Sequence, residues 1–145
     1  MTRVYLWVNI LPVRLVRWRQ GDRWDLLVVE DHRGRSQARD FLDALARDNH
    51  QESQKLERLL ARLADRGPYP DPERYKHLYA NVWEVKTHKV RILVCPAAPA
   101  GLVLLEAFVK RRDKLETAVT QRVDEIVSQM VSLVLKYLGR NGDGN

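Results

Sequence analysis

Cysteine is nearly absent from this chain, and so are the residue patterns that hold metals and nucleotides. Cys95 is the one cysteine among 145 residues, which excludes a disulfide within the chain and a metal site built from several thiolates. No cysteine–histidine spacing typical of metal ligation and no glycine-rich phosphate loop occurs in the sequence. We therefore expect no metal and no cofactor, and we expect Cys95 to pack in a strand as a small apolar side chain.

Long apolar runs are also missing. A membrane-spanning helix needs about 20 consecutive apolar residues, and the apolar N-terminal stretch 4–16 is interrupted by Asn9, Pro12 and Arg14. The same stretch lacks the small-residue cleavage site of a signal peptide. These absences predict a cytoplasmic protein without a membrane partner.

Acidic residues are too few to balance the basic ones. The sequence holds 25 lysines and arginines against 19 aspartates and glutamates, which gives a net charge of +6. This excess favours an acidic partner, such as nucleic acid or an acidic protein surface. The hydrophobic content of 45% and the length predict one globular domain with one core.

The stretch 75–114 contains three apolar runs, at 75–86, 90–95 and 102–109, with short breaks between them. Their β-branched content predicts an antiparallel meander, in which the last run is a central strand buried on both faces. Cations interrupt or follow these runs at Lys86, Lys89, Arg91, Lys110, Arg111, Arg112 and Lys114. A charge in a strand must face water or a charged ligand, so this pattern indicates a surface for a phosphate backbone.

Two helices are expected before the meander. Ser36 is a suitable N-cap for a helix that ends near Asn49, and a second helix runs to about residue 65, where Gly67 is a natural C-cap. Their apolar residues recur at spacings of three and four, which predicts a helical hairpin packed on the sheet. A proline-rich connector at 68–72 follows.

The N-terminal part predicts a β-hairpin that turns at residues 20–22. Its cationic side chains, Arg14, Arg17 and Arg19, either form a solvated face or contact an acidic partner, and the sequence leaves both interpretations open.

The C-terminal part predicts one long helix over 115–138, ended by Gly139 and followed by a mobile tail over 139–145. At ~1.5 Å per residue, such a helix reaches about 35 Å and outruns a small core. We therefore expect the apolar residues Met130, Val134 and Leu138 to contact another protein.

The order of several short motifs resembles the phage-derived branch of the RelE/HigB toxin superfamily. Gly34-Arg-Ser precedes Phe41-Leu, and the later motifs are Tyr75-Lys-His-Leu, Val82-Trp-Glu-Val-Lys86, Val90-Arg-Ile-Leu93 and Leu104-Leu-Glu-Ala-Phe-Val-Lys-Arg111. The resemblance covers residues from about 24 to 122.

This resemblance implies an α+β fold, with a twisted antiparallel sheet, two helices on the N-terminal side and a long C-terminal helix. Residues 24–138 would form the core of a single domain over 1–145, and residues 1–23 would be an additional hairpin segment. The implied activity is ribosome-dependent, metal-independent cleavage of mRNA, which a cognate antitoxin would neutralise.

The resemblance also assigns roles to residues. Its motifs place catalytic cations at Lys86, Arg91, Lys110 and Arg111. Neighbouring side chains are then candidates for binding RNA, namely His88, Lys89, Tyr79, Arg112 and Lys114. In the implied reaction, the 2′-hydroxyl attacks the adjacent phosphate, and cations stabilise the charge that develops there.

The sequence departs from that family pattern in ways that keep a second hypothesis open. Lys86 replaces an arginine, the N-terminal segment is additional, and the last helix is longer and more apolar. The alternative is a non-catalytic, phage-encoded regulator that binds host RNA polymerase or its σ subunit. Such a regulator would contact its partner through the hairpin arginines and the last helix.

Overall fold

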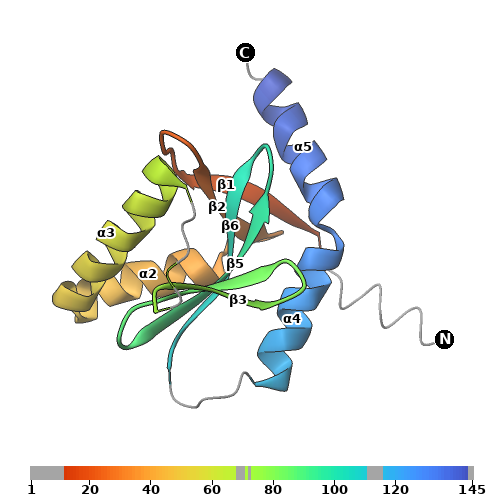
Figure 1. Ribbon diagram of the computed structural model, residues 1–145. Coiled ribbons are helices and arrows are strands. Elements are labelled where there is room, and N and C mark those ends of the chain that lie inside the picture. Colours follow the sequence, from red (N-terminus) through yellow and green to blue (C-terminus); the bar gives the residue numbers. More distant parts are fainter. Residues whose placement is uncertain (1–11, 68–70, 72, 111–115, 144–145) are drawn as a thin grey trace.

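The computed structural model describes residues 12–67, 71, 73–110 and 116–143, and it has an α+β architecture built on a six-stranded sheet (Figure 1). The strands are β1 (Val13–Arg19), β2 (Asp25–Asp31), β3 (Tyr75–Tyr79), β4 (Val82–Lys86), β5 (Val90–Ala97) and β6 (Gly101–Val109). The helices are α2 (Gln37–Asp48), α3 (His50–Arg66), α4 (Thr117–Ser128) and α5 (Met130–Asp143). Residues 1–11 of the predicted N-terminal segment and most of the proline-rich connector lie outside the described residues.

The sheet is mixed: four of its five strand pairings are antiparallel, as predicted, and one is parallel, which the prediction did not include. Its strand order is β1-β2-β6-β5-β4-β3. Short connections join β1 to β2, and they also join each strand to the next from β3 to β6. Each of these four pairs of consecutive strands is antiparallel. β2 and β6 run parallel, with Asp25 opposite Gly101. A parallel pair needs a long connection, and here α2, α3 and three strands lie between its members.

The parallel junction requires glycine at position 101. Gly101 has a φ of +130°, and a Cβ atom there would lie 2.2 Å from the backbone oxygen of Asp25. No larger residue fits this approach without a shift of the backbone. The start of β6 is therefore fixed against the start of β2.

The two helical pairs cover opposite faces of the sheet (Figure 1). The predicted leucines of α2 and α3 form one core with alternate residues of β2, β5 and β6, including Leu60, Ile92 and Leu104. Residues of α4 and α5 form a second core with the other alternate residues, including Leu27 and Leu93. Both faces of β6 are buried, which confirms its prediction as a central strand.

The ends of α2 and α3 follow the local chemistry of their sequence. Ser36 Oγ accepts a hydrogen bond from Arg39 N at 3.3 Å, and Asn49 Oδ1 accepts one from Glu52 N at 3.2 Å. Asn49 thus ends α2 and caps α3. Gly67, with a φ of +79°, follows the end of α3. These boundaries confirm the predicted helical hairpin.

The predicted single C-terminal helix is wrong, because the chain breaks at Gln129 into α4 and α5. The break lets each half pack on a different strand, α4 on β6 and α5 on β1. Gly139 does not end the helix, since α5 continues to Asp143. Arg140 Nη2 donates to the Leu15 oxygen at 2.6 Å, so the first part of the expected tail is helical and tied to β1.

A buried carboxylate on β2 joins three elements near the edge of the sheet. Glu30 accepts hydrogen bonds from Arg14 of β1, at 2.7 and 2.9 Å, and from Arg39 of α2, at 2.6 Å. The bond from Arg39, followed by that from Arg14, lowers the pKa of the Glu30 carboxyl below its ordinary value. Arg14, a candidate for binding a partner, thus has a partner within its own chain.

We expect Glu30→Gln to reduce the dependence of the free energy of unfolding on pH in the acidic range. Because the pKa of Glu30 is lower in the folded chain, its contribution to stability is complete above the unfolded-state pKa. That contribution is lost as the pH falls through the folded-state pKa. The substitution should cost about 1–3 kcal/mol at neutral pH. Urea unfolding from pH 7 to pH 3 measures both effects, and parallel stability profiles for the two proteins would contradict this role.

Candidate functional site

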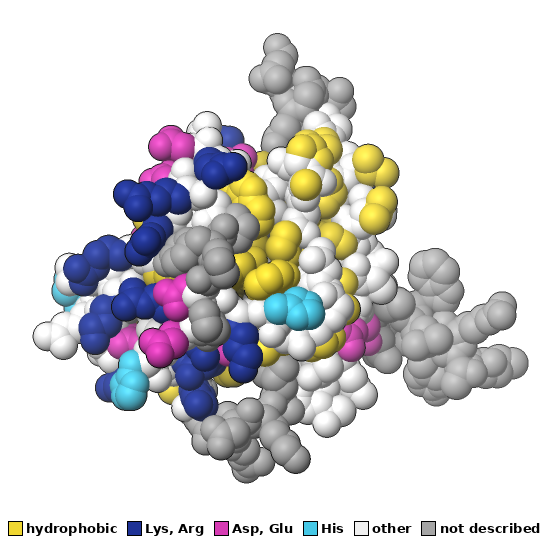
Figure 2. All heavy atoms as spheres, in the orientation of Figure 1, with side chains coloured by type: hydrophobic (Ala, Val, Ile, Leu, Met, Phe, Trp, Pro, Cys, Tyr) yellow, Lys and Arg dark blue, Asp and Glu magenta, His cyan; other side chains and the backbone are white. Residues whose placement is uncertain are grey.

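A basic cleft of about 790 Å³ lies between α3 and the ends of β4 and β5. Seven of its lining residues are lysines or arginines, and the others include one histidine and one acid. The lining consists of Lys55, Arg58, Leu59, Arg62, Glu73, Arg74, Lys86, Thr87, His88, Arg91 and Lys110. Figure 2 shows that lysines and arginines gather on the side of the molecule where α3 lies. This concentration of cations in one concavity suits a ligand with several negative charges.

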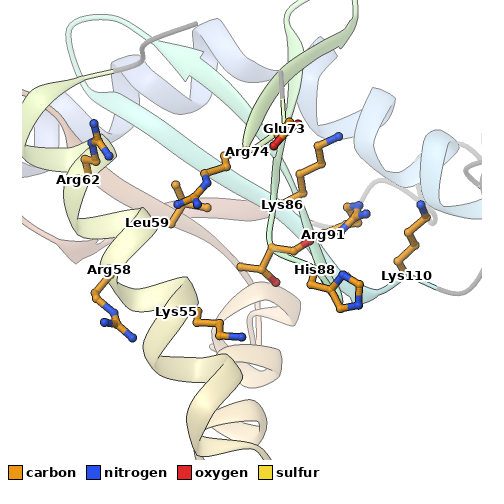
Figure 3. A pocket seen from close by; sticks show the side chains of 11 residues that line it. Lys55, Arg58, Leu59, Arg62, Glu73, Arg74, Lys86, His88, Arg91 and Lys110 are labelled. Atoms are coloured by element: carbon orange, nitrogen blue, oxygen red, sulfur yellow. Dashed lines mark hydrogen bonds between the residues drawn. The ribbon is translucent and has the colours of Figure 1, made fainter. Parts of the chain in front are cut away.

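One wall of the cleft is the outer face of α3. Lys55, Arg58 and Arg62 are spaced by three and four residues, so they lie on one side of the helix (Figure 3). The leucines of α3, such as Leu60, are buried toward the sheet, and this burial orients the basic row toward solvent. Sequence reasoning missed this row. The row could have been predicted from its spacing of three and four residues, because this spacing matches the helical period of the leucines.

The opposite wall comes from the strands and contains three of the predicted catalytic cations. Lys86 at the end of β4 lies opposite Arg91 of β5 in the antiparallel register. Lys110 follows β6, and its backbone N donates to the Lys89 oxygen at 2.8 Å. His88 lies on the turn between β4 and β5 (Figure 3). The structure thus brings Lys86, His88 and Arg91 of the β4–β5 hairpin into one cleft with Lys110 at the end of β6.

Arg91 is held by its own chain more firmly than sequence reasoning expected. Its side chain is 11% exposed, and its Nε lies 3.8 Å from the Glu84 carboxylate. Its Nη1 donates to the backbone oxygens of Thr87, at 2.6 Å, and Val90, at 3.0 Å. Glu84 of β4 thus pairs with a cation of the neighbouring strand. Arg91 therefore supports the turn that carries His88.

Some predicted RNA-binding residues lie elsewhere. The hydroxyl of Tyr79 donates to Asp124 Oδ1 of α4 at 2.9 Å, and burial, then this hydrogen bond, raises the pKa of Tyr79 to about 12. Tyr79 is therefore on the α4 side of the sheet and outside the cleft. The side chain of Lys89 is not part of the cleft lining. Arg111, Arg112 and Lys114 lie outside the described residues.

The other hairpin arginines have partners within the chain, like Arg14. Arg17 lies 3.9 Å from the Asp25 carboxylate. Arg19 hydrogen-bonds Glu57 of α3, and its guanidinium carbon lies 5.6 Å from the centre of a Trp18 ring. These contacts attach the hairpin to its own sheet and to α3.

The apolar face of α5 is displaced from the one that the sequence predicts. Met130 and Val134 are each only 8% exposed, because they pack in the core beneath α5. The exposed residues are Val131 (77%), Leu135 (64%) and Leu138 (38%). The break at Gln129 separates the phase of α5 from that of α4. Two of the three predicted contact residues, Met130 and Val134, are therefore buried, and the third, Leu138, is exposed.

An apolar groove of about 470 Å³ runs beside this exposed face. No charged side chain lines it: the residues are Asn81, Cys95, Pro96, Ala97, Ala98, Pro99, Val127, Met130, Val131, Val134, Leu135 and Leu138. Figure 2 shows hydrophobic side chains gathered on this side, apart from the lysines and arginines. Cys95 is buried, and burial raises the pKa of its thiol, as suits an apolar packing role.

The part of the chain that the structure describes contains no helix with the length and apolar character needed to cross a bilayer. The same residues contain no cluster of three or more side chains suited to hold a metal ion. Neither a scan against protein-family models nor a search of curated proteins gave a match to this sequence.

We expect the cleft to bind single-stranded RNA in a salt-dependent manner, and Lys86→Ala to weaken that binding. Loss of one phosphate contact should reduce the slope of log affinity against log salt by about 0.7. Fluorescence anisotropy with a labelled oligonucleotide over a range of salt measures this slope. Lys136→Ala, at an exposed position on α5, removes the same charge outside the cleft and serves as the control. Equal slopes for both variants would exclude the cleft as the binding surface.

Proposed function

We propose that this protein is an endoribonuclease that cleaves mRNA on the ribosome, as its resemblance to RelE/HigB toxins implies. The observation that supports the proposal best is the convergence of Lys86, His88 and Lys110 in a cleft whose other wall is the basic row of α3. Packing alone does not require cations from separate segments to share one concavity. Cations arranged in this way would bind a ligand that carries negative charge along its length, such as the phosphate backbone of RNA.

The reaction that suits these residues is internal transesterification. The 2′-oxygen of one nucleotide forms a bond to the adjacent phosphorus, and the bond from phosphorus to the 5′-oxygen breaks. The products are a 2′,3′-cyclic phosphate and a 5′-hydroxyl. Negative charge accumulates on the phosphoryl oxygens in the transition state, where the ammonium groups of Lys86 and Lys110 would stabilise it.

His88 has the side chain best suited to proton transfer in the cleft. Histidine is the commonest general acid or base in enzymes. In the proposed reaction, His88 takes the proton of the attacking 2′-hydroxyl, and the leaving 5′-oxygen takes a proton from water. The hydroxide that remains accepts the proton held on His88, which regenerates water and neutral His88. The row of Lys55, Arg58 and Arg62 would bind the flanking phosphates and hold the strand in register with His88.

The partners follow from the same proposal. The substrate is mRNA in the ribosome, and a cognate antitoxin would neutralise the activity. Arg91 retains a part in this scheme as the support of the turn, through its bonds to Thr87 and Val90.

We expect His88→Ala to lower mRNA cleavage by about a hundredfold, because general acid–base catalysis commonly contributes this much. The double variant Lys86→Ala/Lys110→Ala should abolish growth inhibition. Primer extension on mRNA from a reconstituted translation reaction measures cleavage directly, and circular dichroism verifies that each variant folds. Lys136→Ala should cleave like the wild type. Ribosome-bound mRNA that stays intact at stoichiometric wild-type protein would refute the proposal.

A second candidate function is a non-catalytic regulator that binds host RNA polymerase or its σ subunit. The observation that favours it is the exposed stripe of Val131, Leu135 and Leu138 beside an uncharged groove. Exposed apolar area is costly in water, at about 25 cal/mol per Å², and a contiguous patch commonly marks a protein contact. The net charge of +6 would steer the protein toward an acidic partner of this kind.

For this candidate, we expect Val131→Asp/Leu135→Asp to abolish capture of purified RNA polymerase or σ subunit, because both charges would enter the apolar contact. Surface plasmon resonance with the purified proteins measures the affinity. Val109→Asp makes the same change at another exposed valine and should preserve binding. Absence of binding by the wild type rejects the regulator. A concentration-dependent dimer that the double variant dissociates would assign the stripe to a second copy of the chain instead.

A further inference from the structure

The turn between β4 and β5 is fixed by hydrogen bonds on both sides of His88. On one side, Thr87 N donates to the Val90 oxygen at 3.0 Å, and Val90 N donates to Thr87 Oγ1 at 3.1 Å. On the other, the oxygen of Lys89 accepts from Lys110 N at 2.8 Å. The residues that flank His88 are therefore held by the chain, while His88 itself lines the cleft.

A buried carboxylate from α3 completes this arrangement. Glu52 is 4% exposed, although it belongs to a helix whose outer face is basic. Its Oε1 accepts a hydrogen bond from the Thr87 hydroxyl and a longer one, at 3.4 Å, from Lys89 N. The bond from Thr87 is the main reason that the pKa of the Glu52 carboxyl is lowered. Burial of a charge is costly unless hydrogen bonds compensate it, and here the turn supplies them.

The hydroxyl of Thr87 serves both neighbours at once. It donates to Glu52 and accepts from Val90 N, so it joins the helix to the turn through one oxygen atom. Valine has nearly the same shape but can do neither. Serine keeps both bonds and lacks only a methyl group. This pair of substitutions separates the hydroxyl from the packing of the side chain.

The bond also joins the two walls of the cleft. Glu52 lies in the first turn of α3, one helical turn before Lys55 and on the same rigid helix as Arg58. Thr87 lies between Lys86 and His88. The distance between the basic row of α3 and His88 therefore depends on the contact between Glu52 and Thr87.

We infer that Glu52 is a positioning residue that acts through Thr87 to set the place of His88 relative to the basic row of α3. This inference rests on the proposed cleavage of RNA, which it deepens by naming the contact that aligns the two walls. Glu52 touches no substrate in this scheme. Its effect passes through the turn.

The test compares Thr87→Val with Thr87→Ser in single-turnover cleavage of ribosome-bound mRNA. Misplacement of a reacting group by about 1 Å can cost as much as a hundredfold in rate, so Thr87→Val should lower the maximal rate by about ten- to a hundredfold. Its half-saturating protein concentration should change little, because the cations remain. Thr87→Ser should restore the rate to near that of the wild type. Glu52→Ala should act like Thr87→Val, and Glu52→Gln, whose amide oxygen still accepts a hydrogen bond, should retain more activity.

A measurement without RNA keeps the test valid if a variant is unstable. Hydrogen exchange of the Val90 amide reports directly on the bond to Thr87. This amide should exchange faster in Thr87→Val than in Thr87→Ser, while amides of the central strand β6 stay protected. In the His88→Ala background, Thr87→Val should add little further loss of rate, because both changes act on one group.

The possible outcomes separate the two proposals. An active wild type with equal maximal rates for Thr87→Val and Thr87→Ser overturns the role of Glu52 and leaves the cleavage proposal standing. Full additivity of Thr87→Val and His88→Ala also overturns it. A wild type that does not cleave overturns the proposed function and, with it, the positioning role. Fast Val90 exchange together with a lower rate in Thr87→Val, both reversed in Thr87→Ser, supports the inference.

Discussion

The burial of β6 on both faces is the constraint on which the rest of this structure depends. Leu102, Val103 and Leu104 have no exposed surface, and their alternate side chains enter two different cores. A strand of this kind is stable only where both of its faces are covered. The chain covers one face with α2 and α3 and the other with α4 and α5. The basic cleft forms where the ends of β4 and β5 meet the outer face of α3.

Basic residues play two different roles in this protein, and net charge alone does not distinguish them. Arg14 and Arg39 pair with buried Glu30, and Arg122 pairs with buried Glu106 at 2.7 Å, so these arginines join elements of the fold. The cations of the cleft instead line a hollow open to solvent. Arg91 belongs to both groups, since it lines the cleft and supports the turn beside it.

Local chemistry explains which features the sequence could predict. The caps at Ser36 and Asn49 and the spacing of the leucines predicted α2 and α3. The β-branched apolar runs predicted strands β4 to β6. The meander also placed Lys86 near Arg91, because neighbouring strands fix each other's register. The parallel pairing of β2 with β6 was not predictable in this way, because it joins residues that are distant in the chain.

The other errors have the same origin in long-range packing. The basic row of α3 has the pattern of an ordinary solvated helix face, and only the fold shows that Lys86 and His88 lie across from it. Likewise, the apolar residues of α4 and α5 form one continuous helical stripe in the sequence, which led to the prediction of a single helix. The break at Gln129 follows from the need to cover β6 and β1 with separate helices, a requirement that no local pattern contains.

The junction at Gly101 has a consequence for the order in which the chain can fold. The hairpin β1–β2 and the meander β3–β6 each form from contacts between neighbours in sequence. Pairing β2 with β6 must instead close a loop that contains α2, α3 and three strands, and the entropic cost of closure comes before any bond at Gly101 is made. We therefore expect the β1–β2 hairpin and the β3–β6 meander to form first, and the pairing of β2 with β6 to form last. One wall of the cleft, α3, is hydrogen-bonded through its Ala64 oxygen to Arg23 N and Trp24 N beside β2. The other wall comes from the β4–β5 hairpin, so the cleft is complete only once β2 and β6 have paired.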